Sequence, residues 1–179
     1  FGNSSLEEGI AYEVLNFASL ENIPTLFIYE NNFYATEKPS NKGYMKKLNY
    51  LNIINAHGIK YIKVDGNDVS EVYLQTKKMI EYMNKNSKPG FIECITYRWL
   101  EHCGPYYDFQ QNRDFRSKKE FEHWKKACPI NNFRKYLKKR FKNLKIEKLE
   151  NSIIKKAENS YKKAVRSNKP LKQDLLRNV

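Results

Sequence analysis

Residues 1–34 read FGNSSLEEGIAYEVLNFASLENIPTLFIYENNFY, and this stretch decides the fold. Its apolar side chains between positions 6 and 20 recur near the 3.6-residue period, which predicts a helix. Pro24 interrupts that pattern. Residues 25–29 then form a short apolar run typical of a buried parallel strand. The stretch therefore predicts one helix–strand unit with a polar cluster at each end.

The same alternation continues after this unit. Strands are predicted at 59–64 and 91–97, and each follows a predicted helix, at 44–56 and 69–83 respectively. Asn67 or Asp68 is expected to cap the second of these helices. This order is typical of an α/β fold with a parallel sheet and flanking helices. Residues 98–112 show no periodicity and predict a long loop. Helices are predicted beyond it at 118–127, 130–141 and 147–167.

The sign of the net charge changes along the 179-residue chain within the predicted loop, near residue 110. Residues 1–110 hold 11 Lys+Arg and 13 Asp+Glu, a net charge of −2, whereas residues 111–179 hold 22 and 7, a net charge of +15. We expect an α/β domain over 1–110 and a basic helical extension over 111–179. The basic half has no zinc-finger, RNA-recognition or helix-turn-helix signature, so a nucleic-acid partner is disfavoured against a solvated lysine-rich surface. The chain contains no run of 18 apolar residues, so no membrane-spanning helix is predicted.

The two polar clusters suggest a binding site. Ligands of open α/β sheets bind beyond the carboxyl ends of the strands, where Asn3, Ser4 and Ser5 precede the first helix and Asn32 follows the first complete strand. A helix start attracts phosphate, and amide and carbonyl oxygens are ligands for Mg²⁺. Ser4 or Ser5 is also a candidate helix cap. The alternative is that the Asn-Asn pair only forms a turn.

His102 is the candidate histidine of the loop. It lies after the last predicted strand in a segment that contains Gly104-Pro105. A histidine at this position can donate a hydrogen bond to phosphate or transfer a proton near neutral pH. The alternative is an exposed loop histidine without a role. The three cysteines have no CxxC spacing and predict reduced thiols rather than a zinc site.

Several stretches in order resemble one family. The first stretch resembles the thiamine diphosphate motif, in which Gly-Asp-Gly is followed about thirty residues later by Asn-Asn. The chain as a whole is similar to the α subunit of thiamine-diphosphate-dependent 2-oxo acid dehydrogenases. Further matching stretches are AHGIKYIKVDGNDVSEVY (56–73), GFIECITYRWLEHCGP (90–105), WKKACPI (124–130) and LLRNV (175–179). Pyruvate, acetoin and branched-chain relatives share these motifs, so the resemblance leaves the substrate open.

The resemblance implies a set of site residues. Its Mg²⁺ ligands fall on Asn3, the side chain of Asn32 and the backbone carbonyl of Tyr34. Its diphosphate contacts fall on Asn3, Asn32 and the backbone around Ser4 and Ser5. Its active-site histidine, which helps to hold the diphosphate, falls on His102. The implied fold is the thiamine diphosphate-binding α/β fold.

Two positions depart from the family pattern. The family has Asp where this chain has Asn3, and Gly where it has Ser4. A neutral amide oxygen binds a hard divalent cation more weakly than a carboxylate does. Three alternatives follow: a weakened cofactor site, a different metal balance, or a cofactor site no longer used. Restoring Asp at position 3 is expected to tighten binding if the site is otherwise intact.

The resemblance also implies a reaction and partners. The expected activity is oxidative decarboxylation of a 2-oxo acid with acyl transfer to lipoamide, in the cytoplasm. The expected partners are a β subunit, in an α2β2 assembly, and the lipoyl acyltransferase component. The family's β subunit supplies the glutamate that ionises the cofactor, and Phe1 already lies inside a motif, so an N-terminally truncated α subunit without activity of its own is expected. The alternative is a non-catalytic structural subunit of the same fold.

Overall fold

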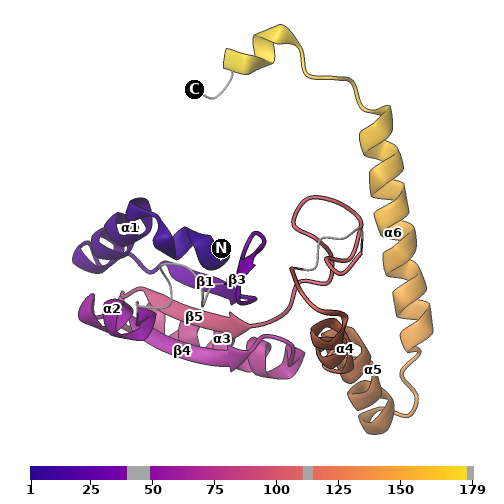
Figure 1. Cartoon of the computed structure of the whole chain (residues 1–179), viewed down its shortest axis with the longest axis horizontal. Coiled ribbons are helices and arrows are strands. Elements are labelled where there is room, and N and C mark those ends of the chain that lie inside the picture. Colours follow the sequence, from indigo (N-terminus) through magenta and orange to yellow (C-terminus); the bar gives the residue numbers. More distant parts are fainter. Residues whose placement is uncertain (40–48, 111–114, 177–179) are drawn as a thin grey trace. The chain divides into compact units, whose positions relative to one another are not determined.

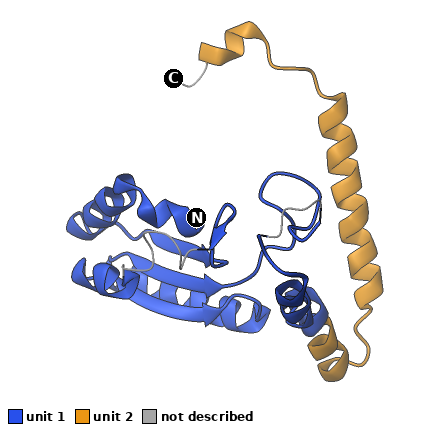
Figure 2. Cartoon of the chain, in the orientation of Figure 1, with its two compact units in different colours: residues 1–133 blue, residues 134–179 orange. Residues whose placement is uncertain are grey.

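The computed structural model describes residues 1–39, 49–110 and 115–176. These residues form two compact units, 1–133 and 134–179 (Figure 2). Unit 1 contains the sheet and the first four α-helices, and α5 begins within it. The elements are η1 (Asn3–Glu7), α1 (Gly9–Leu20), β1 (Leu26–Asn31), β2 (Tyr34–Ala35), β3 (Lys38–Pro39), α2 (Tyr50–Ala56), β4 (Lys60–Asp65), α3 (Val69–Asn86), β5 (Gly90–Ile95), α4 (Lys118–Lys126), α5 (Pro129–Arg140), α6 (Ile146–Arg166) and η4 (Lys172–Leu176).

The main sheet is parallel, as the sequence predicts. Its strand order is β1-β5-β4, with β5 in the centre (Figure 1). The first residues of the chain continue this sheet on the outer side of β1. The Glu30 amide donates to the Phe1 carbonyl at 2.8 Å, and Gly2 forms a parallel bridge with Glu30. The start of the chain and the end of β1 therefore lie side by side.

Apolar side chains cover the sheet on both faces. One core cluster joins η1, α1 and α2 to the sheet through Leu6, Leu15, Tyr29, Ile54, Ile59 and Phe91. The other joins α3 to the opposite face through Val64, Met79, Met83, Ile92 and Cys94. The central strand β5 is buried along nearly its whole length because helices pack against it from both sides. This explains its almost continuously apolar sequence.

The helix before β1 starts later than the periodicity predicts. Residues 3–7 form the 3-10 helix η1, and α1 begins at Gly9 with Glu8 as its N-cap, without a side-chain cap. The prediction that Ser4 or Ser5 caps this helix is wrong, because both lie inside η1. The tighter turn buries Leu6, whose carbonyl accepts a hydrogen bond from the Tyr12 hydroxyl at 2.9 Å.

The other elements agree more closely with expectation. Asp68 caps α3, because its carboxylate accepts hydrogen bonds from the amides of Ser70 and Glu71. Asn49 caps α2, which begins at Tyr50, and residues 44–48 of the predicted helix lie outside the described residues. Within the described residues, no helix is long and apolar enough to cross a membrane.

Candidate functional site

The carboxyl ends of the three parallel strands meet at one edge of the sheet. Ile95 at the end of β5 pairs with Asn31 at the end of β1 and with Asp65 at the end of β4. The residues that follow each strand therefore share this edge, as the sequence predicts for a ligand site. Beside it, Gly66 has no room for a side chain, since a Cβ would lie 2.7 Å from the Ile95 carbonyl oxygen.

A cavity of about 460 Å³ opens at this edge, towards α3. Its polar wall comes from Asn32, Thr96, Arg98 and Glu30, and its remaining wall from Ile28, Gly66, Val72, Cys94 and Tyr97. The Thr96 hydroxyl donates to the Asn67 amide oxygen at 2.9 Å, which ties the end of β5 to the turn after β4. Arg98, Asn32 and Thr96 offer a cation, an amide and a hydroxyl to an anionic ligand, whereas the Glu30 carboxylate in the same wall favours a cation.

Asn3 is a buried hydrogen-bonding centre behind this edge, with only 2% of its surface exposed. Its amide nitrogen donates to the Tyr29 hydroxyl at 2.8 Å and to the Asn31 amide oxygen at 2.7 Å. Its amide oxygen accepts from the Asn32 backbone N–H at 3.1 Å. The side chain thus joins η1 to the end of β1, and its oxygen keeps one lone pair for another partner.

Asn32 and Tyr34 lie in the tight turn that follows β1. The Asn32 amide oxygen accepts from the Tyr34 backbone N–H at 3.0 Å, while Phe33 between them has a left-handed φ of 66°. The Tyr34 hydroxyl donates to Glu120 in α4 at 2.8 Å. Burial, and then the Glu120 carboxylate, raise the pKa of Tyr34 above its ordinary range. This turn brings the Asn32 side chain into the cavity wall.

Ser4 and Ser5 take a different position from Asn32. Ser5 is exposed and lines a separate, mainly apolar cavity of about 190 Å³ beside α1. Its backbone N–H donates to the Gly2 carbonyl at 3.2 Å, and Ser4 is half-buried within η1. The structure brings Asn3 and Asn32 together but does not bring Ser5 to the cavity that Asn32 lines.

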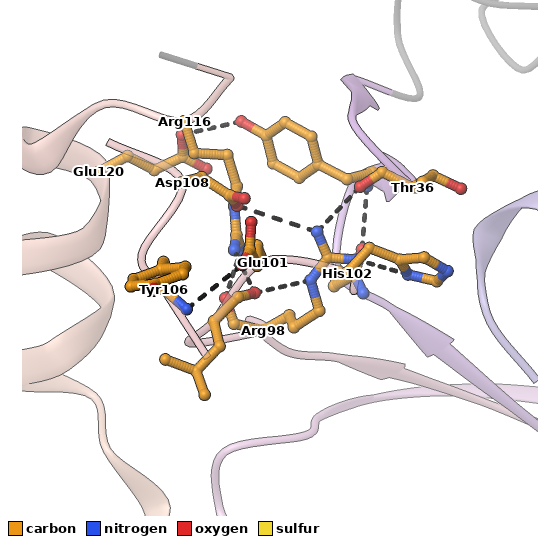
Figure 3. Close-up of polar contacts among 11 residues, drawn as sticks. Thr36, Arg98, Glu101, His102, Tyr106, Asp108, Arg116 and Glu120 are labelled. Carbon is orange, nitrogen blue, oxygen red and sulfur yellow. Dashed lines mark hydrogen bonds and ion pairs between the residues drawn. The ribbon is translucent and has the colours of Figure 1, made fainter. Parts of the chain in front are cut away.

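His102 contacts Arg98 in the loop after β5 (Figure 3). The distance from Arg98 Nη1 to His102 Nδ1 is 3.1 Å. Because a guanidinium only donates, Nδ1 accepts and the ring proton is on Nε2. Arg98 also donates to the carbonyls of Leu100 at 2.9 Å and Thr36 at 2.8 Å. The structure therefore links His102 to the cavity through Arg98.

A buried ion pair holds this loop in shape. Arg116 and Asp108 are 2% and 3% exposed, and Arg116 Nε donates to Asp108 Oδ2. Arg116 also donates to the carbonyls of Arg98 and Leu100. It lies beside Asp108 and Arg98 in Figure 3, and its guanidinium is 4.5 Å from the centre of the Tyr97 ring. Burial, and then the neighbouring Arg116 charge, lower the pKa of Arg98 below its ordinary value. Arg116 therefore shapes the loop and is not available as a surface phosphate ligand.

The sequence patterns do not reveal a buried carboxylate beneath the same edge. Glu93 in β5 is 9% exposed and accepts hydrogen bonds from the Tyr61 hydroxyl and from the Asn31 amide nitrogen, the latter at 2.6 Å. The available signal is a charged residue inside an otherwise apolar strand, because such a residue is rarely buried without a partner.

The comparison with known families agrees with this geometry. Residues 1–173 match the model of the dehydrogenase E1 component. The chain belongs to the dehydrogenase E1 component family. The prediction of 2-oxo acid dehydrogenase α-subunit membership is confirmed.

Curated relatives of this E1 α-family chain are α subunits. The pyruvate dehydrogenase E1 component subunit alpha of Staphylococcus epidermidis is 33% identical over 165 residues, which cover 92% of this chain and 43% of the relative. The 2-oxoisovalerate dehydrogenase subunit alpha of Bacillus subtilis is 33% identical over 141 residues, covering 77% of this chain and 40% of the relative. The chain thus spans about two fifths of these relatives.

The donor set of this E1-family chain suits an anion better than a bare metal ion. Across the described ranges 1–39, 49–110 and 115–176, no group of three or more His, Cys, Asp or Glu side chains could hold a metal. The candidate ligands Asn3, Asn32 and Tyr34 provide neutral oxygens only. A Mg²⁺ ion at such a site would need charge from its ligand, as a phosphate-bound Mg²⁺ has.

Proposed function

We propose that this chain is part of the α subunit of a thiamine-diphosphate-dependent 2-oxo acid dehydrogenase and holds the cofactor's diphosphate with Mg²⁺. The observation that carries the proposal is the cavity at the carboxyl edge of the sheet, whose wall contains Asn32, Thr96 and Arg98. Family membership supports the same function, since the relatives are named as pyruvate and 2-oxoisovalerate dehydrogenase subunits.

Each site residue has a proposed role. Asn32, the Tyr34 carbonyl and Asn3 offer oxygens to Mg²⁺, whose remaining charge is balanced by the diphosphate. Arg98 offers a positive charge at the cavity wall, and His102 offers its Nε2–H to a phosphate oxygen. A diphosphate contact with the backbone around Ser4 and Ser5 stays a prediction. His102 is the proposed catalytic residue on the acceptor side of the site.

The proposed reaction is oxidative decarboxylation of a 2-oxo acid with acyl transfer to lipoamide. Bound thiamine diphosphate supplies the carbanion chemistry, while the protein supplies position and charge. A β subunit, in an α2β2 assembly, would supply the glutamate that ionises the cofactor, and a lipoyl acyltransferase would receive the acyl group. We place this assembly in the cytoplasm. Because the β subunit would supply that glutamate, the α subunit by itself is not expected to be active.

A second candidate function is a structural subunit of the same fold without catalysis. The observation in its favour is Asn3, which is neutral, 2% exposed and hydrogen-bonded through both ends of its amide. A side chain in this environment stabilises the fold whether or not a cofactor is present. The two candidates differ in one property, which is affinity for the cofactor.

Calorimetry separates them. Thiamine diphosphate with Mg²⁺ is titrated into the intact αβ assembly, and inorganic diphosphate with Mg²⁺ serves as the comparison ligand. We expect saturable binding that Arg98→Met weakens about tenfold, because the cation at the cavity wall is lost. Absence of binding at millimolar cofactor would exclude the dehydrogenase and leave the structural subunit.

A further inference from the structure

The turn after β1 holds two non-glycine residues in the left-handed region. The φ angles of Phe33 and Thr36 are 66° and 56°. Residues in this conformation persist only where the surrounding structure holds them. The Asn32 and Asn31 side chains accept hydrogen bonds from the N–H groups of Tyr34 and Phe33, but these bonds lie within the turn itself. Contacts from another element are what fix the turn in place at the sheet edge.

The helix α4 contacts two consecutive residues of this turn. Glu120 Oε2 accepts a hydrogen bond from the Tyr34 hydroxyl at 2.8 Å. The Trp124 ring lies 6.2 Å from the Phe33 ring, and it also stacks at 5.6 Å on Tyr97, which follows β5. Glu120 and Trp124 are four residues apart and therefore share one face of α4. This face joins the turn to the segment after β5.

The bond between Glu120 and Tyr34 is well suited to hold the turn. Glu120 lies in the first turn of α4, where its N–H donates to the side chain of the N-cap Ser117 at 3.1 Å. Burial, and then the Glu120 carboxylate, raise the pKa of Tyr34 above its ordinary range, so the hydroxyl stays a donor at neutral pH. A hydrogen bond to a carboxylate is also stronger than one to a neutral oxygen.

We propose that Glu120 is a positioning residue of the proposed Mg²⁺ site. By holding the Tyr34 hydroxyl, it fixes the turn that presents the Asn32 side chain and the Tyr34 carbonyl to the metal. Removal of such an outer partner of metal ligands typically lowers metal affinity about 10- to 100-fold. The inference rests on the proposed function where it concerns the metal, whereas the effect of Glu120 on the turn is independent of any ligand.

Two substitutions remove this contact from opposite sides. Tyr34→Phe deletes the hydroxyl and keeps the backbone carbonyl, while Glu120→Met deletes the acceptor and keeps a side chain of similar length. In the intact αβ assembly with saturating thiamine diphosphate, each variant should raise the Mg²⁺ concentration for half-saturation about tenfold. The double variant should differ from the single variants by less than about twofold, because both changes remove the same contact. A merely structural role would lower the melting temperature without changing this Mg²⁺ requirement.

Two further variants on α4 are the controls. Glu120→Gln keeps an acceptor oxygen, so its Mg²⁺ requirement should stay within about threefold of the wild type. Glu122→Met removes the same charge from an exposed position on the same helix and should leave the requirement unchanged. An equal effect of Glu120→Met and Glu122→Met, or fully additive effects of Tyr34→Phe and Glu120→Met, would overturn the proposal.

Hydrogen exchange without cofactor gives a second readout. Glu120→Met and Tyr34→Phe should each speed exchange of the amides at 32–36 and leave those of β4 unchanged. If Glu120→Met does not fold, the smaller change Tyr34→Phe decides. An unchanged Mg²⁺ requirement in variants of a wild type that binds the cofactor would overturn the proposal. Faster exchange in the turn, with a wild type that binds no cofactor, would support the effect of Glu120 on the turn and reject the proposed function.

Discussion

At the scale of single residues, the important side chains are buried polar groups rather than exposed ones. Asn3, Glu93 and the Arg116–Asp108 pair each have less than a tenth of their surface exposed. Asn3 and Glu93 hydrogen-bond to Asn31 of β1 from two other elements, and Arg116 holds the carbonyls of the loop after β5. A buried charge with its partner removed is strongly destabilising. These residues should therefore respond to substitution more strongly than the charged surface.

The buried ion pair gives the largest predicted effect. Arg116→Met removes the main partner of Asp108, which is 3% exposed and keeps the longer 3.8 Å contact with Arg98, and it also removes two hydrogen bonds to loop carbonyls. We therefore expect a loss of about 3 kcal/mol in the free energy of unfolding. The control is Arg134→Met in the Arg134–Glu150 pair, where both side chains are 35% exposed and the expected loss is below about 1 kcal/mol. Urea denaturation measures both. Similar losses for the two variants would argue against a structural role of Arg116.

His102 should affect binding and not folding. Its ring is exposed and its Nδ1 contacts Arg98, so His102→Leu, which removes the hydrogen-bond donor, should shift the melting temperature by less than about 2 °C. Loss of the Nε2–H should weaken cofactor binding about tenfold. Scanning calorimetry and titration calorimetry separate the two effects. Unchanged affinity would leave His102 as a loop residue without a role.

The site could be predicted from sequence only in part, and the reason is physical. Asn32 follows a strand directly, so local sequence places it at the sheet edge, where it lines the cavity. The link from Asn31 to Glu93 spans 62 residues, and that from Arg116 to Arg98 spans 18. The spacing of apolar residues shows which face of a single helix or strand is buried. It contains no information about hydrogen bonds between residues far apart in the sequence.

At the scale of elements, the parallel strands were predictable and the details at their ends were not. Alternating apolar runs and helices define β1, β4 and β5, and these form the expected sheet. By contrast, the serines before α1 form a 3-10 helix because burial of Leu6 outweighs their capping preference. Tertiary packing also determines the loop that follows β5.

The loop after β5 requires a glycine at position 104, because of its backbone conformation there. The φ angle of Gly104 is +145°, and a Cβ would lie 1.9 Å from Glu101 Oε1. Gly104→Ala should therefore cost about 1–3 kcal/mol and speed proteolysis within residues 98–108. Gly9→Ala is the control, since α1 has open space at that position and Ala is the better helix former. A neutral Gly104→Ala would contradict the importance of this loop conformation.

At the scale of the whole molecule, one buried and two half-buried tyrosines make stability fall at alkaline pH. Burial, followed by Tyr12 and Glu7, raises the pKa of Tyr50 to about 12, and burial with Glu93 also raises the pKa values of Tyr29 and Tyr61. The ordinary tyrosine pKa is about 10. A raised folded-state pKa gives stability that is complete below the unfolded pKa and is lost as pH rises through the folded value.

We therefore expect the melting temperature to fall between about pH 10 and pH 12 as these tyrosines ionise. Tyrosinate absorbance near 295 nm, recorded with circular dichroism, gives the check. Ionisation of the buried tyrosines should coincide with unfolding, while exposed tyrosines such as Tyr73 ionise earlier. Complete ionisation near pH 10 in the folded protein would contradict the burial described for these side chains.

The central claim is that the carboxyl edge of the sheet holds a diphosphate and its metal. The most direct measurement is an anomalous difference map from crystals of the intact αβ assembly grown with thiamine diphosphate and Mn²⁺ in place of Mg²⁺. We expect a Mn²⁺ peak within coordination distance of the Asn32 amide oxygen, with phosphate density beside Arg98. Ordered cofactor with its metal away from Asn32, or no peak at this edge at saturating ligand, would contradict it.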